Sequence, residues 1–274
     1  MAWMVRGLRD GIVTTGYPRR PDGYGPNFKG AVEVLPAGGA PGSAGEAVTL
    51  CPTGAITADA NGALELDRGR CILCGRCVAE RPDSFAFTSS IETAAADRSA
   101  LIVPRLLEDD AALAELRGDL ARRVRALRRS IYIRHVDAGS DGAEEWEVAA
   151  LTNPVYDVQR LGVFFTASPK HADVLLVTGV GAAGMEAPLR QTYDLMPEPK
   201  VVVAAGVDAA SGGMVHAGYA ARGGVAGFVP VDVYVPVSPP SPFGILHGIL
   251  EAVGILGSRR HIGAEGPKDE VGAR

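Results

Sequence analysis

The chain has 274 residues, of which 47% are hydrophobic and 22% charged, which is typical of a soluble globular protein with room for two domains. Its net charge of −5 gives no reason to expect nucleic acid as a partner. The apolar stretch from Phe243 to Leu256 is interrupted by His247 and Glu251, so it is too short for the roughly 18 residues of a membrane-spanning helix. We therefore expect no direct membrane span.

The first 45 residues are rich in glycine and proline, and we expect little regular structure before Val48. The next segment alternates apolar and polar residues on both sides of Asn61-Gly62, a dipeptide that favours a two-residue hairpin turn. This hairpin lies between Cys51 and Cys71. Its folding should bring the two cysteines together.

The four cysteines of the chain match the ligand pattern of a bacterial-type [4Fe–4S] cluster. Three lie two residues apart in the stretch RCILCGRC, and a remote cysteine before a proline supplies the fourth thiolate. Zinc is an alternative, although zinc sites usually use two separated CxxC pairs. A disulfide is another, but scarce cysteine and the absence of a secretory signal suggest a reducing compartment. The predicted ligands are Cys51, Cys71, Cys74 and Cys77.

A second cluster of the kind found in two-cluster ferredoxins is not expected. Such proteins carry two copies of the motif, each of which donates its last cysteine to the other cluster. Here all the positions of the second ligand set hold other residues, namely Pro41, Ala44, Ala47 and Arg81. The first part of the chain thus retains the ligands of one cluster only.

A helical pattern follows over residues 108–129, with leucine and valine at intervals of three and four. Acidic residues at its start and arginines at its end complement the helix dipole. We interpret it as a connector whose arginines face solvent or a partner, with anionic lipid as an alternative.

Beyond Ser130 the chain alternates between apolar strands and helices, which predicts a mostly parallel sheet covered on both faces. Ligands in such sheets bind at the carboxyl ends of the strands. The expected strands are 130–136, 172–178, 200–205 and 228–235, and the expected helices are 154–161, 185–195, 214–222 and 242–256.

Gly179, Gly181 and Gly184 form a literal GxGxxG between a strand and a helix, and Asp208 follows the next strand. This arrangement is compatible with a dinucleotide whose pyrophosphate sits at the helix N-terminus. Because glycine is abundant here, a simple tight turn explains the same residues.

Two long segments resemble two different subunits of the formate hydrogenlyase and group 4 NiFe-hydrogenase type, which is related to respiratory complex I. GIVTTGYP (Gly11 to Pro18) with RCILCGRC resembles the ferredoxin-like electron-transfer subunit. RHVDAGS, NPVYDVQRLGVFFTASPKHADVLLVTG, MPEPK and VDVYVP resemble the small hydrogenase subunit, equivalent to the cluster-bearing 20 kDa subunit of complex I. The chain is therefore similar to a fusion of the two.

The resemblance implies an α/β protein with an N-terminal bacterial-ferredoxin-like α+β domain and a C-terminal domain built on a mostly parallel sheet. The implied division is a ferredoxin-like domain over 1–104, a helical connector over 105–130, a small-subunit-like domain over 131–256 and a tail over 257–274. It also makes the turn after Thr178 a tight turn without nucleotide.

The small subunits of this family hold their own [4Fe–4S] cluster, but the chain has no cysteine after Cys77. The matching positions hold oxygen-bearing side chains, which are poor ligands for an iron–sulfur cluster. If they lie together, an arginine, a proton or a hard cation would have to offset their charge, and plain exposure to solvent is the simpler alternative. These positions are Asp141, Glu144, Asp208 and Ser238.

We therefore expect a non-catalytic iron–sulfur and scaffold subunit of a complex I-like or hydrogenase-like complex, with one [4Fe–4S] cluster. The resemblance implies a large subunit and membrane subunits as partners, and a peripheral location on the cytoplasmic face of the cell membrane. A purely structural assembly subunit is the alternative, and a dinucleotide-binding oxidoreductase that uses the turn at Gly179 is a more distant one.

Overall fold

The structure, a computed structural model, describes residues 2–36, 44–59, 61–104, 115, 118–120, 122–124 and 130–256. Most of the helix predicted over 108–129 and the whole tail over 257–274 lie outside these ranges.

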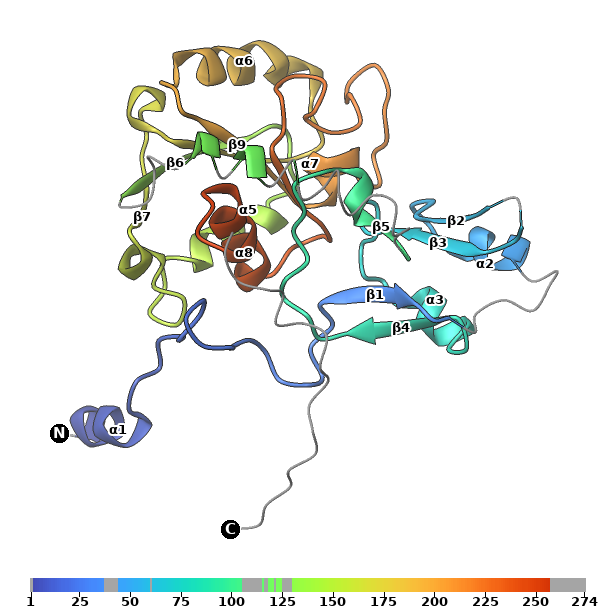
Figure 1. Cartoon of the computed structure of the whole chain (residues 1–274), viewed down its shortest axis with the longest axis horizontal. Helices are drawn as coiled ribbons and strands as arrows, with labels where there is room; N and C mark the ends of the chain where they lie inside the picture. Colours follow the sequence, from blue (N-terminus) through green and yellow to red (C-terminus); the bar gives the residue numbers. More distant parts are fainter. Residues whose placement is uncertain are drawn as a thin grey trace.

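A five-stranded, fully parallel sheet forms the larger part of the described chain (Figure 1). Its central strands are runs of β-branched and aliphatic residues such as VLLVT and VVVAA, which suit a sheet buried on both faces. This confirms the predicted α/β fold class. In the order β10-β9-β8-β6-β7, the strands are β10 (Val233–Val235), β9 (Val201–Ala205), β8 (Val174–Thr178), β6 (Ile131–Asp137) and β7 (Val163–Phe165).

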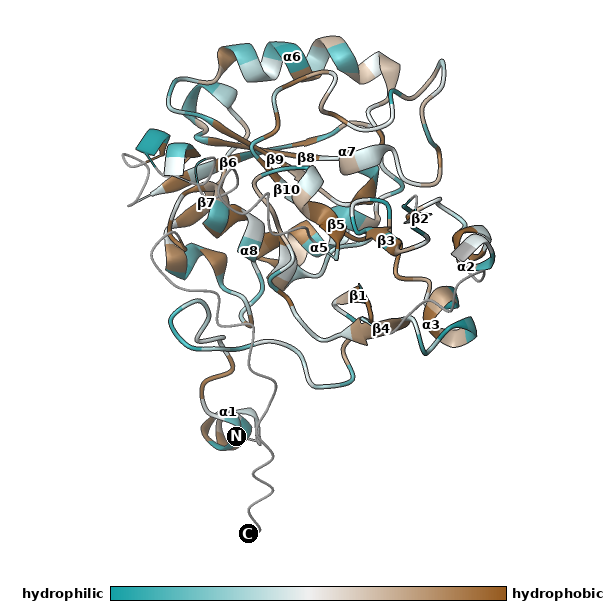
Figure 2. Ribbon diagram, turned by 45° about the vertical axis from the view of Figure 1, so that its right-hand side comes forward, coloured by the Kyte–Doolittle hydropathy of each residue, from teal (hydrophilic) through white to brown (hydrophobic). Residues whose placement is uncertain are grey.

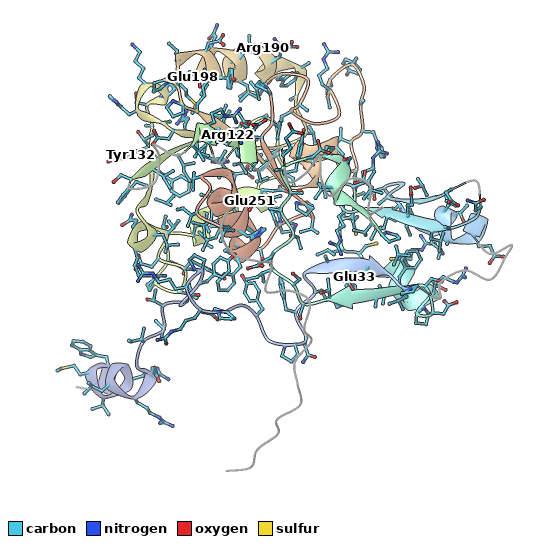
Figure 3. All side chains as sticks on the ribbon, viewed as in Figure 1. Glu33, Arg122, Tyr132, Arg190, Glu198 and Glu251 are labelled. Atoms are coloured by element: carbon cyan, nitrogen blue, oxygen red, sulfur yellow. The ribbon has the colours of Figure 1, made fainter. Side chains whose placement is uncertain are left out.

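Helices cover both faces of this sheet. Helix α6 (Glu186–Leu195) packs on one face through Leu189, and polar side chains such as Arg190 lie on its outer side (Figure 3). Hydrophilic residues colour much of this helix in Figure 2. Helices α5 (Ala143–Ala150) and α8 (Pro242–Ala252) pack on the other face. The short helix α7 (Val207–Ser211) follows β9, and three 3-10 turns complete this part: η4 (Val158–Leu161), η5 (Pro169–His171) and η6 (Ala183–Met185).

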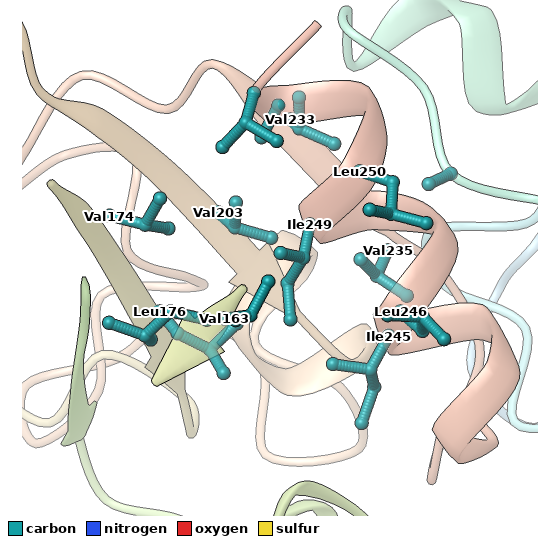
Figure 4. Close-up of a cluster of buried hydrophobic side chains, with 14 of the residues drawn as sticks. Val163, Val174, Leu176, Val203, Val233, Val235, Ile245, Leu246, Ile249 and Leu250 are labelled. Carbon is teal, nitrogen blue, oxygen red and sulfur yellow. The ribbon is translucent and has the colours of Figure 1, made fainter. Parts of the chain in front are cut away.

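Helix α8 is apolar on nearly all sides because it is buried between the sheet and the N-terminal part of the chain (Figure 4). Its start is fixed by Ser241, whose Oγ accepts a hydrogen bond from the Gly244 N–H at 3.2 Å, and by Pro242 in the first turn. Gly248 permits the close approach to β10, because a Cβ there would lie 2.3 Å from Val235 Cγ2.

The N-terminal part contains two small antiparallel sheets. In one, β1 (Ala31–Val34) pairs with β4 (Phe85–Thr88), and in the other β3 (Leu64–Asp67) lies between β2 (Ile56–Ala58) and β5 (Ile102–Val103). The β2-β3 hairpin is the predicted one, with Gly62 at φ +82° in its turn. The remaining elements are α1 (Ala2–Asp10), α2 (Ala44–Leu50), α3 (Arg76–Glu80) and η1 (Ser99–Leu101).

Several expected elements differ in the structure. The expectation of little regular structure before Val48 was wrong, because α1, β1 and the start of α2 all precede it. No helix forms over 214–222, where glycines at φ +82° and +54° (Gly212 and Gly213) begin an irregular loop. Over 154–161 only η4 is helical.

The two parts of the chain pack against each other. Ala95 and Tyr234 exchange two backbone hydrogen bonds of 2.8 and 2.9 Å, which joins the N-terminal part to the edge strand β10. Tyr24 and Tyr156 share a hydroxyl hydrogen bond of 2.7 Å, and both rings pack edge-on against Phe243 of α8. The N-terminal part is therefore fixed to the α/β domain by backbone and aromatic contacts.

Candidate functional site

All four cysteines line one small cavity in the N-terminal part. Cys51 follows α2, Cys71 and Cys74 lie on the loop after β3, and Cys77 is in α3. The hairpin β2-β3 brings Cys51 to this loop, as expected. Their role as ligands stays a prediction.

Backbone N–H groups around the cavity donate hydrogen bonds to cysteine sulfur atoms. The Ala55 N–H donates to Cys51 Sγ at 3.2 Å, and the Leu73 N–H donates to the Cys71 sulfur. Thr53 Oγ1 donates to the carbonyl of Arg70 at 2.7 Å, which ties the turn carrying Cys51 to the other cysteines. N–H groups directed at sulfur stabilise thiolates and tune the potential of a cluster.

The cysteine loop curls through two left-handed residues, Leu73 at φ 52° and Gly75 at φ 74°. A Cβ at Gly75 would lie 3.0 Å from the Phe87 ring, so glycine is needed for both the backbone and the packing. The curl turns successive cysteines toward one cavity.

Burial raises the pKa of Cys71 to about 12 and shifts the pKa of Cys77 in the same direction. The neighbouring cysteines add to both shifts, because several thiolates in one cavity repel each other. A positively charged group would offset this cost. Four soft sulfur donors, with N–H groups directed at Cys51, Cys71 and Cys77, therefore fit an iron–sulfur cluster.

Within the described ranges, no three His, Cys, Asp or Glu side chains lie close enough together to hold a single metal ion. The four cysteines thus share a cavity without converging on one point. A cubane cluster differs from a single ion, since it presents a separate iron corner to each thiolate.

Of the positions expected for a second ferredoxin-type cluster, Ala47 is fully buried in the apolar core that also contains Cys71. Arg81 forms an ion pair with Asp83 at 3.5 Å. Pro41 lies outside the described residues.

The four substituted positions of the α/β domain come together at the carboxyl edge of the sheet. Ser238 Oγ, on the loop after β10, donates to Glu144 Oε1 in the first turn of α5 at 2.8 Å. The charges of Asp208 on α7 and Asp141 before α5 both act on Glu144. Plain exposure, the simpler alternative, is wrong for Glu144, which is fully buried, and holds for Asp141.

The environment of Glu144 opposes a negative charge. Burial raises its pKa, and the charges of Asp208 and Asp141 raise it further. The hydrogen bond from Ser238 and the residue's own backbone N–H act in the opposite direction but do not reverse the shift. Burial and the charge of Asp141 also raise the pKa of Asp208.

The sequence analysis did not predict the network of polar side chains around Glu145, which lies next to Glu144. Glu145 accepts hydrogen bonds from the Ser140 hydroxyl at 2.6 Å and from the Thr178 hydroxyl, and Thr178 also contacts His135 Nε2 at 3.0 Å. Burial lowers the pKa of His135 despite the nearby Glu145. The signal in the sequence was that His135 and Thr178 lie near the carboxyl ends of adjacent strands, where polar groups meet.

The GxGxxG segment forms a turn that the chain's own backbone fills. A Cβ at Gly179 would lie 2.7 Å from the Ser140 nitrogen, and one at Gly181 would lie 2.3 Å from the Gly224 carbonyl oxygen. Both glycines have positive φ. Close packing against the chain's own backbone explains both glycines without a nucleotide.

A cavity of about 270 Å³ lies between the cysteine loop and the turn that carries Ser238. Leu73 of the cysteine loop lines this cavity, and so do Pro239 and Pro240 of the turn after Ser238. Lys29 and Glu147, which carry opposite charges, also line it. Residues next to Cys74 and to Ser238 in the sequence therefore line one cavity, although neither Cys74 nor Ser238 lines it.

None of the helices in the described ranges has the length and apolar content to cross a bilayer.

A family model described as "NADH ubiquinone oxidoreductase, 20 Kd subunit" matches residues 142–252.

Relatives match beyond that segment. Formate hydrogenlyase subunit 7 of Escherichia coli K12 is 35% identical over 173 residues, which cover 63% of this chain and 67% of the relative. The probable membrane-bound hydrogenase subunit mbhJ of Pyrococcus furiosus is 35% identical over 134 residues, 49% of this chain and 80% of the relative. A chain of the archaeal membrane-bound sulfane sulfur reductase aligns at 28% identity and TM-score 0.43, over 48% of this chain and 73% of that one.

Proposed function

This chain belongs to the family of the 20 kDa subunit of NADH:ubiquinone oxidoreductase, and we propose that it is an electron-transfer and scaffold subunit of a membrane-associated oxidoreductase complex. Its relatives are named as subunits of a formate hydrogenlyase and a membrane-bound hydrogenase. The proposed partners are accordingly a hydrogenase-like or complex I-like large subunit and membrane subunits. The proposed location is the cytoplasmic face of the membrane, reached through these partners.

The observation that carries the proposal is the shared cavity of the four cysteines. Cys51, Cys71, Cys74 and Cys77 would hold one [4Fe–4S] cluster, which supplies one-electron transfer when bound. The protein's own contribution is the sulfur set, of which Cys71 and Cys77 are buried, the N–H groups directed at Cys51 and Cys71, and the curled loop between Cys71 and Cys77.

The test is anaerobic purification of the chain with its co-purifying partners, followed by iron and sulfide analysis. We expect about four irons and four sulfides per chain. Cys74→Ser removes one predicted ligand and should lose most of the iron, whereas Arg76→Gln, at an exposed residue that begins α3, should keep it. Zinc in place of iron, or about eight irons per chain, would contradict the proposal.

A purely structural role is the second candidate, favoured by the absence of any cysteine after Cys77. Without thiolates the α/β domain cannot carry the next iron–sulfur cluster of a conventional relay. Reduction of the purified complex, followed by electron paramagnetic resonance, distinguishes the two roles. A reducible cluster that partner subunits oxidise supports electron transfer, and a cluster needed only for assembly supports the structural role.

A further inference from the structure

Glu144 is a buried carboxyl group with one oxygen that has no partner. Its exposed fraction is 0%, although it lies on the first turn of a helix at the edge of the sheet. Oε1 accepts the hydrogen bond from Ser238 at 2.8 Å, and Oε2 is buried without any hydrogen bond. An ionised carboxylate leaves this oxygen uncompensated, which costs far more than burying a neutral carboxyl group.

The chain also makes room for this side chain. Gly206 lies against it, and a Cβ at that position would be 2.7 Å from Glu144 Cγ and from Glu144 Oε1. Gly206 has φ +94°, a conformation that other residues rarely adopt. The backbone between β9 and α7 is thus shaped around the glutamate.

Among the residues that the structure describes, the charges that act on Glu144 are acidic and not basic. The two nearby groups that act on it are Asp208 and Asp141, and both are acidic. Arg134 and Val136 are two residues apart in β6, so their side chains lie on the same face of the sheet. Val136 packs in the core on one face and α5 packs on the other, so Arg134 lies on the face away from Glu144. The other titratable groups on the elements around α5 are His135 and Asp137 of β6, Glu145 and Glu147 of α5, and His247 and Glu251 of α8.

A cation is not the better explanation, because no three acidic or histidine side chains in the described chain are close enough to hold one. The neighbouring Glu145 provides a contrast within the same helix turn. It accepts hydroxyl hydrogen bonds from Ser140 and Thr178 and lies 3.8 Å from His135, so both of its oxygens have partners.

We propose that Glu144 is a proton-binding site, in which the folded chain keeps the carboxyl group protonated at neutral pH, with the proton on Oε2 and the Ser238 hydrogen bond on Oε1. The inference does not rest on the proposed function, since it concerns a different part of the chain from the cysteines. Asp208, half-buried, and Asp141, exposed, supply the negative charge that retains the proton.

The direct test is infrared spectroscopy of the full-length chain at neutral pH. The wild type should show the C=O stretch of a protonated carboxylic acid, shifted in heavy water, and Glu144→Gln should lose this band. The matched control Glu145→Gln should retain it. Ser238→Ala should move the band to higher frequency, because the carbonyl oxygen loses its donor. A wild type without the band, or a Glu144→Gln variant that keeps it, overturns the proposal.

Thermal unfolding against pH gives a second readout. A raised pKa means that the folded chain binds more protons than the unfolded chain, so the Glu144 contribution to stability falls as pH rises above the ordinary value of 4.5. Glu144→Gln should remove the Glu144 contribution to the fall of stability with rising pH. It should also raise the Tm at neutral pH by about 5 °C.

Asp208→Asn should make this fall end at a lower pH, because it removes a charge that raises the pKa of Glu144 in the folded chain. If Mg²⁺ or Ca²⁺ raises the Tm of the wild type but not that of Glu144→Gln, the site holds a cation and the proposal is wrong. Equal pH slopes for wild type and Glu144→Gln would also overturn it.

Discussion

Arg98 contacts both parts of the chain through one guanidinium group. Its two terminal nitrogens bind the carboxylate of Asp67 at 2.7 and 2.6 Å, and its Nε donates to the Ala210 carbonyl at 3.3 Å. The group packs directly over Gly69, where a Cβ would lie 2.6 Å from Arg98 Cζ. The planar guanidinium of arginine can donate to a carboxylate and to a carbonyl at the same time, whereas the single ammonium group of lysine cannot reproduce this geometry.

Arg98→Met should therefore lower the free energy of unfolding by about 1–3 kcal/mol. The lower half of that range is expected, because Asp67 keeps a hydrogen bond from the Gly69 N–H at 2.9 Å. Chemical denaturation measures the change. Arg190→Met is the matched control, since Arg190 pairs with Glu186 on the exposed face of α6 and should change stability by less than about 0.5 kcal/mol. Equal effects of both substitutions would contradict this role of Arg98.

Single residues differ in how much the sequence reveals of them. The cysteine spacing predicted a common site because it depends only on a short loop and one hairpin. The resemblance raised the possibility that Asp141, Glu144 and Asp208 lie together, with plain exposure to solvent as the simpler alternative. The hydrogen bonds of Glu145 with Ser140 and Thr178 could not be predicted, because they depend on the register of β6 and β8 and on side-chain direction.

Helix α7 and the turn before it set the position of Asp208 and the space around Glu144. Gly206 begins the turn, and its N–H donates to the Val235 carbonyl at 3.0 Å, so the turn is fixed to β10. Asp208 then lies in the first turn of α7. A side chain at position 206 would meet Glu144 directly.

Gly206→Ala should destabilise the chain by about 2–4 kcal/mol, through strain at positive φ together with displacement of Glu144. Thermal or chemical denaturation is the measurement. Gly184→Ala is the control, because a Cβ at Gly184 would meet no atom within 4 Å, and it should change stability by less than about 0.5 kcal/mol. A Gly206→Ala variant as stable as this control would show that the turn can relax.

Element prediction succeeded where hydrophobic periodicity was strong. The strands β6, β8 and β9 and the helices α6 and α8 are apolar or amphipathic, glycine directly follows β8 and β9, and α8 begins at a proline. The segment 214–222 misled because its composition suits a helix, while the glycines before and after it fix an irregular loop. Helix α5 was missed because its sequence AEEWEVAA forms no continuous apolar face, and only Glu144 and Val148 are buried.

At the scale of the molecule, the two parts share a core. Tyr17, Ile91 and Ala94 from the N-terminal part are buried in the same cluster as β6, β8 and α8. The backbone pairing of Ala95 with Tyr234 adds to this contact. Neither part can lose its fold without exposing apolar surface of the other.

We therefore expect the chain to unfold in one cooperative transition. Scanning calorimetry should give a calorimetric enthalpy equal to the van't Hoff enthalpy, because the shared core couples the two parts. Fluorescence and circular dichroism should report the same midpoint. Two separated transitions would show that the contacts between the parts are too weak to couple them.

The attachment of Arg98 to Ala210 has an evolutionary consequence. The acceptor is a backbone carbonyl, which every residue possesses, whereas Arg98 and its partner Asp67 both come from the N-terminal part. Side chains on α7, including that of Asp208, can therefore be exchanged over generations without loosening the junction. The side chains that hold the junction thus all belong to the N-terminal part. The residues around Glu144 in the α/β domain can change without breaking these contacts.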